Sequence, residues 1–94
     1  MKMQMVMVYQ IMHTDDFIYF GKDFDCPVLP PVGADVVVDD STCQVNGVCI
    51  NIQRQQISVE FEAWFMHKKQ REAIRRERIQ LGWTELDDPP GCNC

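Results

Sequence analysis

The chain has 94 residues, of which 46% are hydrophobic and 24% are charged, and its formal net charge is −5. This length allows one compact domain with a single modest core. The balance of apolar and charged residues is that of a globular protein, which excludes wholesale disorder. An acidic surface repels polyanions, so the net charge disfavours general binding to nucleic acid or to anionic membranes.

The N-terminal run MKMQMVMVYQIMH is fairly apolar, but Gln4 and Gln10 interrupt it and no small-residue cleavage site follows. No segment approaches the roughly 18 apolar residues that a membrane span requires. The five cysteines form an odd and sparse set, which favours reduced thiols over a disulfide scaffold. We therefore expect a cytoplasmic protein that contacts no membrane.

The first part of the chain predicts a β-hairpin. The segment alternates as a strand does: one face carries Met3, Met5, Met7, Tyr9 and Ile11, and the other carries Lys2, Gln4, Val6, Val8 and Gln10. Residues 13–16 have the composition of a turn, and residues 17–20 (FIYF) read as the returning strand.

A proline-rich connector follows the hairpin. Three prolines between residues 27 and 31 remove backbone donors and fix φ, so the segment is expected to be extended and irregular. We expect Val28, Leu29 and Val32 to lie underneath it, against one end of the sheet.

Three more strands are predicted between residues 36 and 63. Val36 to Val38 form the first, and Asn46-Gly47 divides the next run into either a tight hairpin or one bent strand. We favour the bent strand, because the two hairpin arms would each be short. After the polar turn QRQQ, the segment ISVEFEA alternates, with Ile57, Val59 and Phe61 facing inward.

Residues 30 to 63, PPVGADVVVDDSTCQVNGVCINIQRQQISVEFEA, resemble the strand meander of SH3-like small barrels. Such meanders have Pro-x-x-Gly before a Val-rich strand, a bent central strand, and a polar turn into a final alternating strand. The resemblance implies architecture only, and no binding residue is carried over from it. We therefore predict an α+β domain over residues 1 to 86. It would have a small curled antiparallel sheet or SH3-like partly closed barrel of about five strands, then one C-terminal α-helix. Residues 87 to 94 would form a flexible tail.

The predicted helix runs from Trp64 to Leu81, where good helix formers predominate. Gly82 stands at the C-cap position, and Trp83 is placed to fold back onto the last turn. A thin apolar stripe would dock the helix on the sheet, and its members are Met66, Ala73, Ile74 and Leu81.

Six of the nine basic residues lie between residues 66 and 80, which gives this segment a charge of +4 and the remainder −9. At 100° per residue, four cations share one face within about 80°, and they are Lys68, Arg71, Arg75 and Arg78. This face can contact phosphates, can be a solvated face in which Glu72 pairs with Arg75, or can dock on an acidic protein or a second copy.

The aromatic residues are numerous for so small a core, so some are expected near the surface, where apolar clusters mark partner sites. The alternative is simple core filling. We take as candidate partner-binding residues Lys68, Arg71, Arg75, Arg78, Trp64 and Trp83.

The sequence offers no catalytic or metal-binding motif. Cys43 and Cys49 lack knuckle spacing, and the terminal Cys92 and Cys94 follow a proline-rich segment. The two histidines stand in no nucleophile–base pattern, and there is no P-loop, dinucleotide fingerprint or nucleophile elbow. We assign no catalytic residue, no metal and no cofactor.

These observations predict a non-catalytic module that binds a protein partner, with a homodimer as one form of such binding. In size and charge the chain resembles the small accessory or inhibitory proteins that phages and mobile elements encode. Two alternatives stay open: a nucleic-acid contact through the basic face, and an enzyme or metal-binding protein that uses cysteines.

Overall fold

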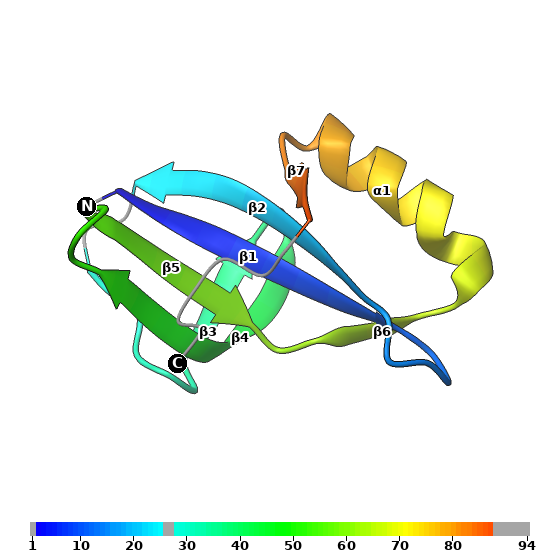
Figure 1. Ribbon diagram of the computed structural model, residues 1–94, viewed down its shortest axis with the longest axis horizontal. Helices are drawn as coiled ribbons and strands as arrows, with labels where there is room; N and C mark the ends of the chain where they lie inside the picture. Colours follow the sequence, from blue (N-terminus) through cyan, green and yellow to red (C-terminus); the bar gives the residue numbers. More distant parts are fainter. Residues whose placement is uncertain (1, 26–27, 88–94) are drawn as a thin grey trace.

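The computed structural model describes residues 2–25 and 28–87. In these ranges the chain forms seven strands, one 3-10 turn and one α-helix (Figure 1). In chain order the elements are β1 (Lys2–Ile11), β2 (Phe17–Asp25), β3 (Asp35–Val38), β4 (Ser41–Asn51), β5 (Gln56–Phe61), β6 (Trp64–Met66), the 3-10 turn η1 (Lys68–Gln70), α1 (Arg71–Gln80) and β7 (Thr84–Leu86).

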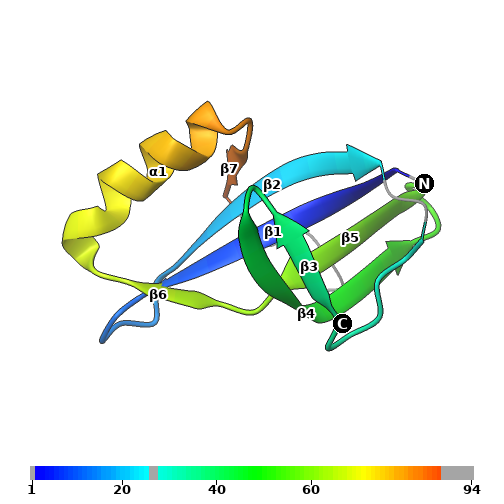
Figure 2. The ribbon, with the colours of Figure 1, turned by 180° about the vertical axis from the view of Figure 1, so that it is seen from behind.

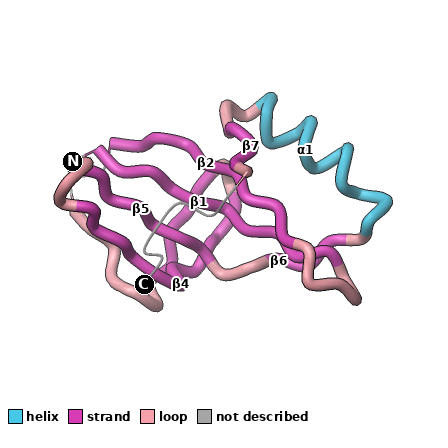
Figure 3. The backbone as a smooth tube through the Cα atoms, in the orientation of Figure 1, coloured by secondary structure: helices cyan, strands magenta, loops and turns pink. Residues whose placement is uncertain are grey.

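β1 is central to the sheet, whose strand order is β3-β4-β5-β1-β2-β7. It pairs antiparallel with β2 from Lys2 to Gln10. On its other side it pairs in parallel with β5 at residues 4–6 and with β6 at residues 9–11. Figure 3 shows β5 and β6 following one another along the same side of β1.

The α+β class is confirmed, with one sheet and one helix towards the C-terminus. The predicted sheet differs from the observed one in three respects. It has seven strands in the described part of the chain instead of about five, it includes parallel pairs, and its strands do not close into a barrel. The added strands are β6 and β7, each three residues long, which are too short to produce a recognisable alternation.

The core cluster lies on the face of β1 that carries its odd-numbered residues, as the alternation predicts. Val6 and Val8, on the other face of β1, are buried as well. β4 is one strand with a register shift between Val45 and Gly47, which confirms the bent strand. Figure 2 shows the first half of β4 and β3 lying across this face of the sheet. The bend brings together buried side chains from both layers, including Met3, Met5, Met7, Val38, Cys43, Val45, Val59 and Phe61.

Two local packing predictions are wrong. Val28 and Val32 are exposed, although Leu29 is partly buried against the core. In the helix region, Ala73 and Leu81 are also exposed, and only Ile74 of the predicted stripe within α1 packs on the core.

The helix begins later than the sequence predicts. Residues 64–66 form β6 because they find strand partners in Tyr9, Gln10 and Ile11, and α1 starts at Arg71. The predicted end is confirmed. Gly82 has φ 94°, and the Trp83 amide donates to the Arg78 carbonyl oxygen at 2.9 Å, so the chain folds back on the last turn. Of the predicted tail, only Asp87 falls inside the described residues.

Phe61 and Phe65 provide a matched test of where the core lies. Phe61 is buried, whereas Phe65 is 69% exposed four residues later. We expect Phe61→Ala to lower the free energy of unfolding by about 3–5 kcal/mol, because it removes a whole ring from the core. Phe65→Ala should change it by no more than about 0.5 kcal/mol. Urea unfolding followed by tryptophan fluorescence measures both, and equal losses would contradict the core assignment.

Candidate functional site

The structure divides the predicted basic face of the helix. Arg78 is only 5% exposed, and Arg75 Nε lies 2.8 Å from Glu85 Oε2 on β7. Lys68 and Arg71 are exposed and form no ion pair with a described residue. The expectation of four cations on one solvent-exposed face is therefore wrong for Arg78 and is weakened for Arg75.

The two tryptophans differ in how far their side chains are exposed. Trp83 is 2% exposed and packs at a tilt against Phe24, with ring centroids 6.0 Å apart. Trp64 is half-buried and meets the Tyr9 ring edge-on at 5.8 Å. Trp83 is thus a core residue in this structure, and Trp64 is only partly exposed.

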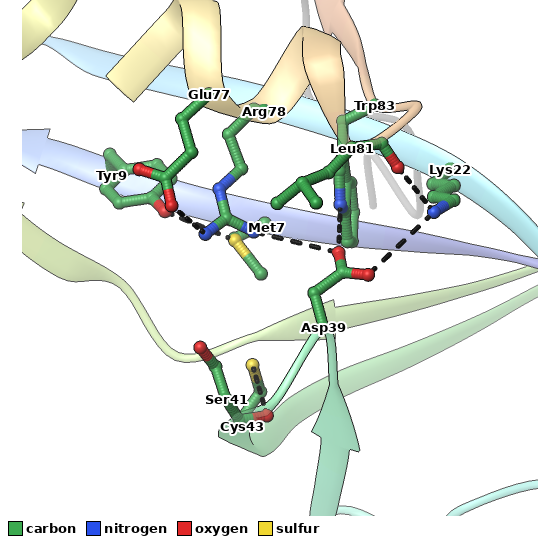
Figure 4. A network of polar contacts seen from close by, with 10 residues as sticks. All are labelled: Met7, Tyr9, Lys22, Asp39, Ser41, Cys43, Glu77, Arg78, Leu81 and Trp83. Atoms are coloured by element: carbon green, nitrogen blue, oxygen red, sulfur yellow. Dashed lines mark hydrogen bonds and ion pairs between the residues drawn. The ribbon is translucent and has the colours of Figure 1, made fainter. Parts of the chain in front are cut away.

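Arg78 and Trp83 converge on Asp39 (Figure 4). Trp83 Nε1 donates a hydrogen bond to Asp39 Oδ2 at 2.7 Å, and Arg78 Nη1 lies 3.9 Å from the same oxygen. Lys22 Nζ lies 4.0 Å from Asp39 Oδ1 and donates to the Leu81 carbonyl oxygen at 2.6 Å. We call these four side chains, Asp39, Arg78, Trp83 and Lys22, the Asp39 clamp.

The backbone places Asp39 at the tip of the β3–β4 hairpin. Asp39 and Asp40 have φ values of 51° and 64°, a left-handed conformation that Asp tolerates better than most residues. The tight turn points the Asp39 carboxylate at the end of α1. The clamp therefore fastens the hairpin that covers the core to the helix.

The environment of Arg78 is largely sealed from solvent. Its Nε and Nη1 have no hydrogen-bond partner among the described residues, and Nη2 lies 3.8 Å from Glu77 Oε1. A buried cation without a full set of acceptors is costly unless an anion compensates it. Asp39 and Glu77 supply that negative charge.

Two nearby ionisable groups are kept neutral. Burial raises the pKa of the Tyr9 hydroxyl and the pKa of the Cys43 thiol, while the Arg78 charge opposes both shifts. The Tyr9 hydroxyl donates to Met7 Sδ at 3.3 Å. A buried, protonated thiol is a poor nucleophile, so the surroundings of the clamp favour a structural role.

The other cysteine on β4 behaves differently. Cys43 is a free thiol, whereas Cys49 is disulfide-bonded. The expectation of reduced thiols is therefore right for Cys43 and wrong for Cys49. Cys26, Cys92 and Cys94 lie outside the described residues.

A second feature lies on the opposite face of the sheet. Gln10 of β1 is in register with Phe65 of β6 on one side and with Phe17 of β2 on the other. Phe65 is 69% exposed and Phe17 is 44% exposed. The ring of Tyr19 stacks on Phe17 with centroids 6.3 Å apart. We call Phe17, Tyr19 and Phe65 the aromatic row.

The aromatic row arises because strand alternation sends these rings away from the core. Ile18 and Met66, the neighbours of Phe17 and Phe65, are buried on the core face. The Gln10 side chain turns towards the hairpin and donates to the Thr14 carbonyl oxygen at 3.1 Å. The strand predicted at residues 17–20 places Phe17 and Tyr19 on one face, but the sequence gives no sign that Phe65 joins them, because β6 is too short to be recognised.

Two clefts are formed by described residues. One, of about 500 Å³, has Lys22 and Asp23 among its lining side chains. The other, of about 220 Å³, lies beside it and includes Lys2 and Arg54. Neither lining includes His13 or Cys43.

No three His, Cys, Asp or Glu side chains in the described ranges are grouped to hold a metal ion. Within the same ranges no helix has the length and apolar character needed to cross a bilayer. Comparisons of the chain with protein-family models, with curated proteins and with solved structures gave no match.

The clamp predicts unequal effects of two neighbouring substitutions. We expect Asp39→Asn to lower the free energy of unfolding by about 1–3 kcal/mol, because it leaves the Arg78 charge without its anion while Asn can still accept from Trp83. Asp40→Asn is the control, since Asn tolerates the same left-handed backbone, and it should change stability by no more than about 0.5 kcal/mol. Both are measured by urea unfolding. Similar losses for the two variants would show that the turn, and not the clamp, is responsible.

Proposed function

We propose that this chain is a non-catalytic protein-binding module whose contact surface is the aromatic row. The observation that carries the proposal is the exposure of Phe65 and Phe17, two large rings that flank Gln10 on one sheet face, with Tyr19 stacked on Phe17. Removing apolar surface from water favours association, and the loss of rigid-body freedom and side-chain ordering offset part of that gain. Aromatic side chains are also enriched where proteins meet.

The charges around the molecule support a protein partner over a polyanion. The net charge is −5, and two of the four predicted phosphate-contacting cations, Arg75 and Arg78, are placed beside acidic groups of this chain. Each phosphate contact lowers the logarithm of the binding constant by about 0.9 for each unit rise in the logarithm of the salt concentration. A protein that makes few such contacts gains little from counterion release and binds nucleic acid weakly. A small accessory or inhibitory role fits a module of this size.

The protein-binding proposal is tested with a matched pair of surface variants. The chain is immobilised, proteins retained from its native cells are identified by mass spectrometry, and the comparison is repeated with Phe17→Ser/Phe65→Ser. The control is Ile52→Ser, at a side chain that is 84% exposed near the β4–β5 turn. We expect the retained partner to be lost with the double variant and kept with the control. Equal retention by all three proteins contradicts the proposal.

The competing function is a nucleic-acid contact through Lys68 and Arg71. We expect retention on immobilised DNA and RNA to be weak and to change little between low and moderate salt, because the net charge is −5 and Arg75 and Arg78 lie beside acidic groups of the same chain. Column retention at two salt concentrations measures this. Strong binding at low salt that falls steeply with added salt and disappears in Lys68→Glu/Arg71→Glu would favour nucleic acid instead.

A further inference from the structure

The middle of β1 is buried on the face that points away from the core, which we call the outer face. Val6 is 0% exposed and Val8 is 4% exposed, and both lie outside the core cluster. Gly21, opposite Val6 on β2, has no side chain to cover it. On β5, Ser58 is buried, and burial raises the pKa of the Glu60 carboxyl. Among the described elements, β3, the first half of β4 and α1 pack on the core side (Figure 2), so none of them covers this face.

A disulfide-bonded cysteine lies on the same outer face. Cys49 of β4 is in register with Ser58 of β5, which is in register with Gln4 of β1. The Gln56 side chain, two residues before Ser58, donates to Gln4 Oε1 at 3.3 Å, which places these strands' side chains on one face. The other cysteine of β4, Cys43, is a free thiol in the core. The partner of Cys49 in the disulfide is therefore one of three residues, Cys26, Cys92 or Cys94.

The strand registers exclude Cys26. Three strand spacings and two residue steps separate Asp25 from Cys49, a distance of about 16 Å. Cys26 is one residue, about 3.8 Å, beyond Asp25, so it stays about 12 Å or more from Cys49. A disulfide requires Cα atoms within about 7 Å of each other. The chain also continues from Cys26 to Leu29 and Ala34, which pack against the core on the opposite face.

The C-terminal cysteines are within reach. β7 ends at Leu86, and a Cβ on Gly21 would lie 2.9 Å from Leu86 Cδ1, so the Leu86 side chain lies over β2 on the outer face. Four strand spacings and four residue steps separate Leu86 from Cys49, a distance of about 23 Å. Cys92 and Cys94 follow Leu86 by six and eight residues, which span about 20–22 Å and 26–29 Å when extended. The disulfide itself adds about 4–7 Å between Cα atoms.

The path between these two points crosses the buried valine. β1 is the middle of the five strands from β7 to β4, and a straight path from Leu86 to Cys49 passes over it at the level of Val6. Pro89 and Pro90 stand near the middle of the connecting segment. Proline fixes an extended φ and has no backbone N–H that needs a partner. An apolar stretch of chain therefore falls where the sheet has an apolar, buried surface.

We propose that residues 88–94 cross the outer face of β1 and are held there by a disulfide between Cys49 and one of the two C-terminal cysteines, Cys92 or Cys94. A dithiol that supplies two electrons and two protons opens this bond to two thiols and itself becomes a cyclic disulfide. A disulfide oxidant such as oxidised glutathione closes the bond by the reverse exchange. Reduction releases the segment and uncovers Val6 and Val8. The inference does not depend on the function proposed above, because the aromatic row lies further along β1, around Gln10.

Peptide mapping of the unaltered chain tests the bond. The chain is unfolded without reduction, its free thiols are blocked with iodoacetamide, and it is cut with trypsin. Residues 23–54 then carry Cys26, Cys43 and Cys49, and residues 79–94 carry Cys92 and Cys94. We expect one mass that joins the two peptides and that separates on reduction. An internal disulfide within residues 23–54, or peptides that carry only blocked thiols, overturns the proposal.

Exposure of the valine methyl groups tests the cover. Val59 is the matched control, because it is 0% exposed like Val6 but lies in the core. A soluble gadolinium chelate should relax the methyl groups of Val6 and Val8 severalfold faster in Cys92→Ser/Cys94→Ser, or in the unaltered chain after dithiothreitol. Val59 should be unaffected, and Cys26→Ser should leave all three valines protected. Val6 and Val8 that stay protected after the bond is removed, or that become exposed only together with Val59, overturn the proposal.

Discussion

The carboxylate of Asp39 links the β3–β4 hairpin to the C-terminal end of α1 and to Trp83. It stands on a hairpin tip that the bend of β4 carries over the sheet, and it accepts the indole N–H of Trp83 just beyond the helix. Arg78 and Lys22 place positive charge on either side of it. α1 buries little apolar surface, and Arg78 is its buried residue. The position of the helix therefore depends more on polar contacts at its C-terminal end than on the burial of an apolar face.

These contacts change the role expected of the basic segment at residues 66–80. A run rich in Lys and Arg on an acidic protein looks like a surface for polyanions, yet Arg78 points inward and Arg75 is held by Glu85. Part of the positive charge compensates the acidic groups of the same chain. What remains exposed in this segment is a smaller set of cations, which includes Lys68 and Arg71.

Much of the fold follows from local patterns. The alternation of β1, the turn before Phe17, the bent β4 and the glycine that ends α1 are all set by neighbours in sequence, so the sequence predicts them. β6 and β7 escape prediction because three residues become a strand only when a partner lies beside them. The clamp and the aromatic row escape for the same reason. Asp39 and Trp83 are 44 positions apart, and no spacing rule links them.

The bend in β4 occurs at a β-bulge, where this strand has one residue more than β5. Val45 is opposite Phe61 and Gly47 is opposite Glu60, which leaves Asn46 without a counterpart on β5. A chain lacking Asn46 would keep Val45 and Val48 on their present sides, because strand alternation would then run unbroken. The ladder would straighten nonetheless, and β3 would extend sideways in the plane of its neighbours. The bend of β4, more than the hydrophobic pattern of the strands, creates the enclosed core of this small protein.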